Sequence, residues 1–234
     1  MSATLRSTAA THPGAVRPRN EDSLVDRPDL GLWAVADGAG GHGSGDVASA
    51  AIAETLAAIP PGLTAAEMLA QVRLRLDAVH ANLKTRAEAR GGGIIASTVA
   101  VLLVRGGHYA ALWAGDSRIY LLRDAGLHRL SRDHSLVQEL VDAGALVAEQ
   151  AEAHPQANVI TRAVGAGKAL ALDKVADRLA RGDRFLLCSD GVFKELPEAE
   201  IASRLARGAD AEELVRRAVE AGARDNVTVV VVEG

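Results

Sequence analysis

Two segments that are apolar on both alternating faces constrain the fold more than any other feature of the sequence. Residues 31–36 (Gly-Leu-Trp-Ala-Val-Ala) and 226–232 (Asn-Val-Thr-Val-Val-Val-Val) have apolar residues at both odd and even positions, with Asn226 and Thr228 as the polar exceptions. A strand with one face in water would alternate apolar and polar residues, whereas a strand covered on both faces does not. We therefore expect sheets that are buried on both sides.

Helical patterns lie between the predicted strands. A helix is expected from about Ser44 until Pro60-Pro61, and a second, long one starts after the capping-box sequence Thr64-Ala65-Ala66-Glu67. Two more are predicted, over residues 197–206 and after Asp210. Residues 134–165 lack strand periodicity and are expected to form short helices and loop.

The other β-like runs lie in two groups. Residues 94–104, 108–114 and 118–122 are separated by short Gly-containing turns, which predicts an antiparallel meander. A further strand pair is expected over residues 170–179 and 184–188. Strands and helices do not alternate strictly, so the fold class predicted is α+β: a four-layer α-β-β-α sandwich with two antiparallel sheets flanked by helices.

Length and composition limit the kind of protein. The 234 residues suit a single domain over 1–234, with a core of Ala, Val, Leu and Ile because aromatic residues make up only 3%. A net charge of −4 with dispersed charges argues against nucleic-acid binding. One cysteine, no signal-peptide pattern and no long apolar run predict a cytoplasmic protein without a membrane span, and we expect a monomer.

Several aspartates share one kind of position, at a strand end or in a tight turn. They are Asp22, Asp37, Asp116, Asp190 and Asp225. Aspartate favours turns for local reasons, so any one of them alone has a commonplace explanation. As a set they are harder to dismiss, because carboxylates close to a core would repel one another unless cations neutralised them.

The chemistry of this set indicates hard divalent cations. Oxygen ligands without His or Cys favour Mg²⁺ or Mn²⁺ over zinc. Two such ions can bridge a water molecule, lower its pKa and direct it at phosphorus. Arg17 adds a guanidinium that can bind two phosphate oxygens, although an exposed arginine beside Pro18 would by itself be a weak indication.

Five short motifs, in order, resemble the PP2C (PPM) family of metal-dependent Ser/Thr protein phosphatases. They are residues 17–22 (Arg-Pro-Arg-Asn-Glu-Asp), 36–38 (Ala-Asp-Gly), 115–118 (Gly-Asp-Ser-Arg), 189–191 (Ser-Asp-Gly) and 225–226 (Asp-Asn). Residues 133–135 and 158–165 are similar to the bacterial branch. Each motif is weak alone, but together they span nearly the whole chain.

The resemblance implies a role for each matching residue. Asp37 would bridge two Mn²⁺ or Mg²⁺ ions, the Gly38 carbonyl would bind one of them, and Asp190 and Asp225 would hold the other. Glu21, Asp22 and Asn226 would support these ligands, and Arg17 would hold the substrate phosphate. Catalysis is thus assigned to Arg17, Asp37 and Asp190. Bacterial members often bind a third ion, for which Asp116 and Asp190 are the expected ligands, and carry a flap, here about residues 141–160.

The chain departs from the family pattern at one position that matters. Eukaryotic members have a His directly after Asp-Gly that is thought to protonate the leaving alcohol, whereas this chain has Ala39, with His42 elsewhere in the loop. No general acid is therefore assigned among the side chains. Residues 189–196 also look like phosphatases that accompany type VI secretion kinases, so phosphorylated proteins and a cognate Ser/Thr kinase are the expected partners.

Other readings of the sequence are less favoured. The spacing Gly38-x-Gly40-x-x-Gly43 matches a dinucleotide fingerprint, but a second helix follows where a parallel strand is required. Cys188 lies in an apolar run and is better explained as a buried small residue than as a phosphatase nucleophile. His42, His134 and His154 are interpreted as loop or surface residues. A catalytically inactive phosphoprotein binder and a phosphatase of small phosphoesters stay open.

Overall fold

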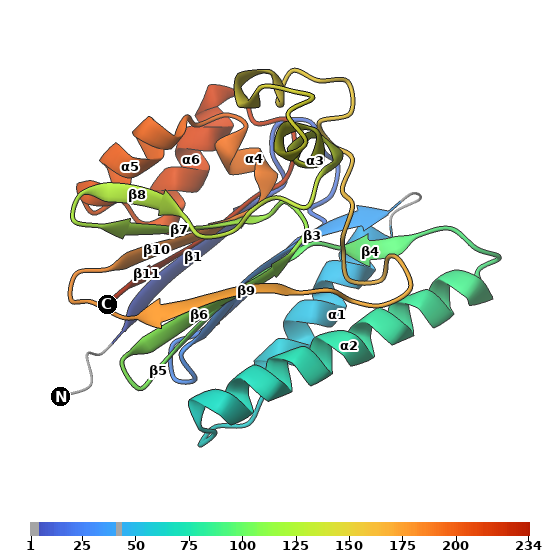
Figure 1. Cartoon of the computed structure of the whole chain (residues 1–234), viewed down its shortest axis with the longest axis horizontal. Helices are drawn as coiled ribbons and strands as arrows, with labels where there is room; N and C mark the ends of the chain where they lie inside the picture. The colour runs from blue at the N-terminus through green and yellow to red at the C-terminus, as the bar shows by residue number, and fades with distance from the viewer. Residues whose placement is uncertain (1–4, 41–43) are drawn as a thin grey trace.

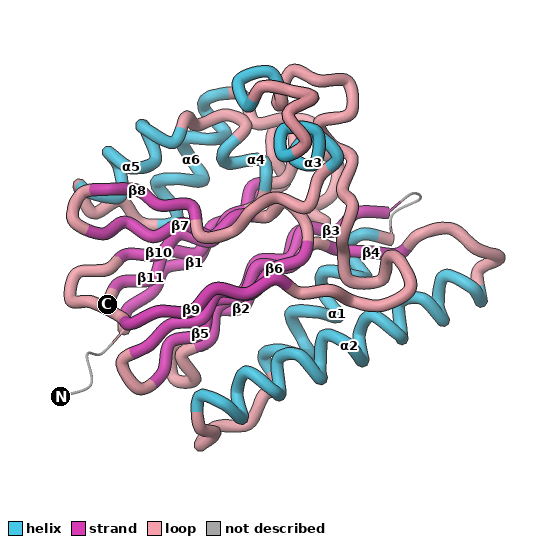
Figure 2. The backbone as a smooth tube through the Cα atoms, viewed as in Figure 1, coloured by secondary structure: helices cyan, strands magenta, loops and turns pink. Residues whose placement is uncertain are grey.

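The protein is a sandwich of two antiparallel sheets with helices on both outer faces (Figures 1 and 2). The structure, a computed structural model, describes residues 5–40 and 44–234. The sheet orders are β1-β11-β10-β7-β8 and β2-β3-β5-β6-β9, with β4 paired to β3. Every strand pairing in this described part is antiparallel, as predicted, so the parallel sheet that a dinucleotide fingerprint requires is not formed there.

The strands are β1 (Arg6–His12), β2 (Asp22–Arg27), β3 (Leu32–Gly40), β4 (Ile95–Ser97), β5 (Val99–Arg105), β6 (His108–Ala114), β7 (Arg118–Arg123), β8 (Gly126–Arg129), β9 (Asp173–Arg178), β10 (Arg184–Cys188) and β11 (Val227–Glu233). The helices are α1 (Gly45–Ala57), α2 (Ala65–Ala89), α3 (Leu136–Asp142), α4 (Asp190–Phe193), α5 (Glu198–Ala206) and α6 (Ala211–Ala221), with a 3-10 turn at Ala148–Gln150. None of the helices in the described residues is both long enough and apolar enough to cross a membrane.

Three apolar layers hold the four structural layers together. Trp33, Leu102 and Val230 belong to the cluster between the two sheets. A second cluster joins α1 and α2 to the outer face of the six-stranded sheet, and a third joins α4, α5 and α6 to the other sheet. Since β3, β5 and β11 contribute residues to an inner and an outer cluster, the apolar residues on both of their faces are explained.

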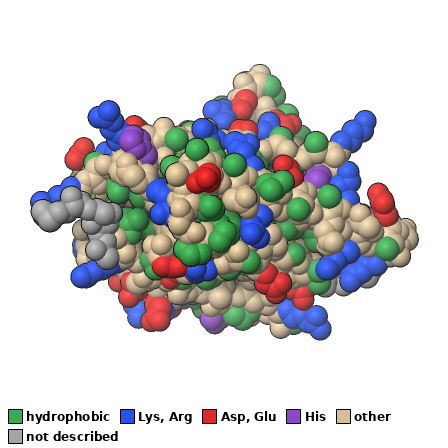
Figure 3. All heavy atoms as spheres, turned by 90° about the horizontal axis from the view of Figure 1, so that it is seen from below, with side chains coloured by type: hydrophobic (Ala, Val, Ile, Leu, Met, Phe, Trp, Pro, Cys, Tyr) green, Lys and Arg blue, Asp and Glu red, His purple; other side chains and the backbone are tan. Residues whose placement is uncertain are grey.

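The helix boundaries follow the local signals in the sequence. Thr64 caps α2 with a reciprocal capping box to Glu67, as predicted. Asp210 accepts a hydrogen bond from the Glu213 N–H at the start of α6. On the face seen in Figure 3, Lys and Arg side chains are interspersed with Asp and Glu, in keeping with the dispersed charge of the sequence.

Two predicted strand pairings were wrong. β5 and β6 pair with each other, but β7 leaves them for the second sheet and pairs with β10 and β8. Likewise β9 pairs with β6, whereas the next strand, β10, pairs with β7 and β11. A short turn can lead to the facing sheet as easily as to a neighbouring strand, and both sheets bury apolar residues, so the local pattern does not distinguish the two outcomes.

Strand β3 extends further than predicted. The sequence suggested an end at Ala36 and a turn at Asp37-Gly38, but the strand continues to Gly40 because residues 38–40 pair with β4. The predicted run over residues 94–104 is in turn divided into β4 and β5 at Thr98. His42 and Gly43 lie outside the described residues.

Leu102→Ala tests the inter-sheet core. Leu102 is fully buried between the sheets, so its truncation should lower the free energy of unfolding by about 2–5 kcal/mol, measured by urea denaturation. The matched control is Leu74→Ala on α2, where the side chain is 63% exposed and little change is expected. Equal losses for the two variants would contradict this account of the core.

Candidate functional site

The predicted site residues lie at one edge of the sandwich, at or near the ends of strands from both sheets. Asp22, the first residue of β2, is the cross-strand partner of Asp37 on β3. Asp116 lies in the turn between β6 and β7, Asp190 is the first residue of α4, and Asp225 precedes β11. Acidic side chains directly opposite each other in a sheet repel, so the Asp22–Asp37 pair has a cost that the fold has to offset.

The backbone of Asp37 is fixed by Thr98. The Asp37 N–H donates to Thr98 Oγ1 at 3.0 Å, and the Asp37 carbonyl accepts from the Thr98 N–H at 2.9 Å. Thr98 Oγ1 also shares a hydrogen bond of 2.7 Å with Ser117 Oγ, next to Asp116. The break between β4 and β5 therefore places the Thr98 hydroxyl between the Asp37 backbone and Ser117.

Gly38 and Gly45 allow a close approach at the same edge. A Cβ on Gly38 would lie 2.2 Å from the Gly45 carbonyl oxygen, and a Cβ on Gly45 would lie 2.5 Å from the Gly38 carbonyl oxygen. Only glycine fits at both positions, since these contacts are with rigid backbone. The first turn of α1 can thus lie against the Gly38 carbonyl.

Asp22 links the two sheets. Its Oδ2 accepts from Ser189 Oγ at 2.8 Å and from Thr228 Oγ1 at 2.6 Å, while its Oδ1 is buried without a partner in the described structure. Ser189 Oγ in turn accepts from the Thr228 N–H at 3.0 Å. A buried carboxylate oxygen without a hydrogen bond is costly and indicates that a donor or cation belongs beside it.

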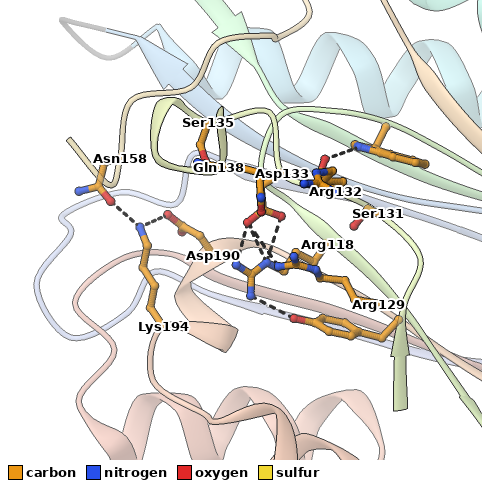
Figure 4. A network of polar contacts seen from close by, with 12 residues as sticks. Arg118, Arg129, Ser131, Arg132, Asp133, Ser135, Gln138, Asn158, Asp190 and Lys194 are labelled. Atoms are coloured by element: carbon orange, nitrogen blue, oxygen red, sulfur yellow. Dashed lines mark hydrogen bonds and ion pairs between the residues drawn. The ribbon is translucent and has the colours of Figure 1, made fainter. Parts of the chain in front are cut away.

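Tight packing brings α4, which begins at Asp190, against the Asp225-Asn226 segment. A Cβ on Gly191 would lie 2.1 Å from the Asn226 carbonyl oxygen, so α4 contacts the Asp225-Asn226 segment directly. Arg118 anchors the other end of α4, because its guanidinium lies 3.6 Å over the Phe193 ring. The same guanidinium forms a two-pronged ion pair with Asp133 (Figure 4).

Asp116 is held by an unusual turn. Gly115 has φ of +114°, and a Cβ there would lie 2.6 Å from the Thr98 Cβ. The Gly115 N–H donates to His134 Nδ1 at 3.2 Å, and the Gly115 carbonyl accepts from the His134 N–H at 2.9 Å. His134 is thus a buried support of this turn and not a surface residue, and burial lowers its pKa, which favours the neutral ring that can accept at Nδ1.

Arg17 and Asn226 organise the segment before β2. Arg17 forms an ion pair of 2.7 Å with Asp225, and its side chain is 53% exposed. Asn226 Nδ2 donates to the carbonyls of Pro13 and Arg19 at 3.0 and 2.9 Å, and Oδ1 accepts from the Glu21 N–H at 2.8 Å. Asn226 therefore determines where Arg17 and Glu21 can lie.

The pKa values of three aspartates at this edge are raised, because the carboxylates are buried and lie close to one another. Burial, reinforced by the charges of Asp22, Asp190, Asp116 and Asp225, holds the pKa of Asp37 well above its usual range. Burial also raises the pKa of Asp22 and of Asp116 to about 7, and in both cases the charge of Asp190 adds to the rise. Cations at this edge would stabilise the charged forms of all three.

Metal ions fit this set by its chemistry. The donors are carboxylates and a carbonyl, the ligands that Mg²⁺ and Mn²⁺ prefer, and Asp22 Oδ1 has no partner. Within residues 5–40 and 44–234, no group of three or more His, Cys, Asp or Glu side chains is arranged so that it could hold a metal ion without some rearrangement. Two of the aspartates are instead bound by cationic side chains, Asp225 by Arg17 and Asp190 by Lys194.

The residues that bind these aspartates could not be identified from the sequence motifs. Thr98, Ser189 and Thr228 support Asp37 and Asp22, and Lys194 contacts Asp190. Ser189 and Lys194 lie within residues 189–196, which resemble the secretion-associated phosphatases. Ser189 binds the distant Asp22, however, and Lys194 binds the distant Asn158 as well as Asp190. The i,i+4 spacing of Asp190 and Lys194 was the one local signal available.

Two alternative sites are disfavoured. Cys188 is fully buried in β10, and burial raises the pKa of its thiol to about 12, which does not suit a nucleophile. An apolar pocket of about 210 Å³, lined by residues that include Leu30, Met68 and Tyr109, lies at the opposite end of β3 from Asp37. It contains none of the aspartates.

The chain belongs to the protein phosphatase 2C family, whose model matches residues 17–225. It is 36% identical to the serine/threonine protein phosphatase PstP of Mycobacterium tuberculosis over 236 residues, which is 98% of this chain and 45% of PstP. The chain therefore spans about half the length of that curated relative. The family resemblance and the fold class expected from the sequence are confirmed.

Solved structures of phosphatases are similar to this chain in both sequence and fold. PppA, described as a key regulatory component of T6SS in Pseudomonas aeruginosa, is 40% identical with a TM-score of 0.90, covering 99% of this chain and 98% of PppA. The catalytic domain of PstP in complex with two manganese ions is 34% identical with a TM-score of 0.82, covering 98% of this chain and 97% of that domain.

Asn226→Asp tests the role of Asn226. A carboxylate would face the carbonyls of Pro13 and Arg19 without a donor, so we expect a loss of about 2–4 kcal/mol in the free energy of unfolding by urea denaturation. The control is Asn82→Asp, which adds the same charge on the exposed side of α2 and should change stability little. A similar small effect in both variants would show that Asn226 does not fix the segment.

Proposed function

We propose that this protein is a metal-dependent phosphatase of phosphoserine and phosphothreonine in proteins. The observation that carries the proposal is the convergence of five aspartates, from five separate segments, on one edge of the sandwich beside an exposed arginine. Membership of the protein phosphatase 2C family supports the same reaction. We expect water and not a side chain to attack phosphorus, because the hydroxyls of Ser189 and Thr228 at this edge are buried and hydrogen-bonded to Asp22.

The ligands proposed are Asp37, the Gly38 carbonyl, Asp190 and Asp225, holding two ions of Mn²⁺ or Mg²⁺. When bound, the ions would activate the water molecule that attacks phosphorus. The manganese ions in the PstP catalytic domain support Mn²⁺ as the first metal to test. Asp22 and Asn226 would support the metal ligands without binding the ions. Asp22 fixes β2 through its bond with Ser189, and Asn226 fixes the segment that carries Glu21.

Arg17 is proposed to bind the substrate phosphate. It already lies beside Asp225, and more than half of its side chain is exposed, so it can turn towards a ligand without disturbing the core. Its guanidinium offers paired N–H donors that match two phosphate oxygens. Ala39 has no proton to donate, so the leaving Ser or Thr oxygen is expected to take its proton from water.

The partners proposed are phosphorylated proteins and the Ser/Thr kinase that modifies them. The similarity to PppA supports substrates in type VI secretion, and comparison of secretion-protein phosphorylation with and without the gene would test that link. A cytoplasmic location and a monomeric state stay predictions. Mg²⁺ in place of Mn²⁺ also stays a prediction. The third ion expected from the sequence is untested, and Lys194 already binds Asp190, one of the two ligands expected for that ion.

Hydrolysis of a phosphothreonine peptide should require both the metal and Asp190. We expect activity with Mn²⁺, loss of activity after thorough chelation, and a drop of at least about 100-fold in kcat for Asp190→Ala. Cys188→Ala is the control and should retain activity, because this thiol is buried away from solvent.

Four outcomes would contradict the proposal. Activity that survives chelation would exclude the metal mechanism. Loss of activity in Cys188→Ala with retention in Asp190→Ala would favour a cysteine nucleophile. Hydrolysis of small phosphoesters without hydrolysis of phosphopeptides, or phosphopeptide binding without hydrolysis, would favour the two alternatives left open by the sequence.

Arg17→Ala should weaken use of the phosphopeptide. Loss of a charged, two-pronged contact is worth about 1.5–3 kcal/mol, so kcat/KM should fall roughly 10- to 150-fold, with most of the change in KM. Arg19→Ala removes a neighbouring exposed arginine side chain and serves as the control. Equal falls for both variants in steady-state kinetics would indicate a general charge effect and not a phosphate contact.

A further inference from the structure

Lys194 lies at the metal edge with two partners. Its ammonium forms an ion pair with Asp190 Oδ2 and donates a hydrogen bond of 2.8 Å to Asn158 Oδ1 (Figure 4). Lys194 is four residues after Asp190 and caps the end of α4, so both side chains leave the same side of this short helix. The Lys194 side chain is only 33% exposed, which distinguishes it from an ordinary surface lysine.

Strand register places Asp116 near the Asp190–Lys194 ion pair. Arg118 is the cross-strand partner of Cys188 in the antiparallel β7–β10 pair, so Asp116, two residues before Arg118, and Asp190, two residues after Cys188, lie at the same end of that pair. Lys194, bound to Asp190, is therefore a cation close to two carboxylates. Asp116 and Asp190 are the pair from which a third metal site was predicted.

The position of Lys194 is fixed by the packing of α4. Phe193, next to Lys194, lies under the Arg118 guanidinium, and Arg118 is bound to Asp133. Gly191 contacts the Asn226 backbone at the other end, and Val192 is fully buried. The ammonium is thus presented by a rigid element, and only the side-chain torsions of Lys194 are free to change.

Asn158 connects this group to residues 141–160. That segment leaves α3 and returns beside it, where the Leu136 N–H donates to the Val159 carbonyl at 2.8 Å and Ser135 pairs with Ile160. Asn158 therefore lies at the returning end of the segment expected to act as a flap. Its side-chain contact with Lys194 joins that end to Asp190.

We propose that Lys194 is a built-in cation that takes the place of a third metal ion between Asp116 and Asp190 and ties the 141–160 segment to the active site. The inference rests on the proposed function, because it takes Asp190 as a metal ligand. An ammonium is a compact charge with three donors, so it can bind a carboxylate and the Asn158 amide oxygen together. Because Lys194 engages Oδ2 of Asp190, the other oxygen, Oδ1, can still bind one of the two catalytic ions.

The number of bound Mn²⁺ ions tests this inference. Isothermal titration with Mn²⁺ alone, supported by metal analysis after gel filtration, should give two ions in the wild-type protein. Lys194→Met keeps the length of the side chain but removes its charge and should bind three. Adding Asp116→Ala to Lys194→Met should return the number to two, because it removes a ligand of the new site.

Three single variants serve as controls. Lys194→Arg keeps a cation and should bind two ions. Lys168→Met removes an exposed charge away from this edge and should also bind two. Asn158→Ala leaves the ion pair with Asp190 and should bind two ions, but hydrogen exchange in residues 141–160 should become roughly tenfold faster because one charged hydrogen bond is lost.

The outcomes separate this inference from the proposed function. Three ions in the wild-type protein, or two in Lys194→Met, would overturn the role of Lys194 while leaving the two-metal phosphatase intact. Unchanged exchange in Asn158→Ala would overturn the tie to the 141–160 segment. Absence of Mn²⁺ binding together with absence of hydrolysis in the wild-type protein would instead reject the proposed function itself.

Discussion

Repulsion among buried carboxylates is the constraint on which the rest of the site depends. Asp22 and Asp37 face each other on neighbouring strands, and Asp116 and Asp190 act on the same region. A fold tolerates such crowding only if cations or hydrogen-bond donors offset it. The hydroxyls of Ser189 and Thr228 offset part of the cost at Asp22, and metal ions are proposed to supply the rest.

The chain supplies cations of its own at the rim of this cluster. Arg17 binds Asp225 and Lys194 binds Asp190. The Asn226 side chain holds the segment that carries Arg17, and the Asn226 backbone packs against Gly191 in α4. Arg17 is exposed and can exchange its partner for a phosphate, whereas Lys194 is more enclosed and has a second partner in Asn158. This difference in exposure is why the two cations are assigned different roles.

Much of the fold could be predicted from local patterns, because helix caps and strand burial are properties of short segments. Thr64 marked the start of α2, and the residues on both faces of β3 and β11 indicated a four-layer sandwich. The pairings of β7 and β9 could not be predicted, since either sheet would have buried the same apolar residues. The sequence placed the end of β3 before Asp37 because β4, which pairs with residues 38–40 and so extends β3, is 55 or more residues away.

The sequence by itself determined the family and the set of aspartates, since those depend on residue type and order. It also determined that Ala39 offers no proton, because no arrangement can give a methyl group that ability. Only the tertiary structure decided which groups support the aspartates: Thr98 for Asp37, Ser189 and Thr228 for Asp22, and Lys194 for Asp190. Most of these contacts join residues far apart in the chain, and their geometry exists only after both sheets and α4 have packed together.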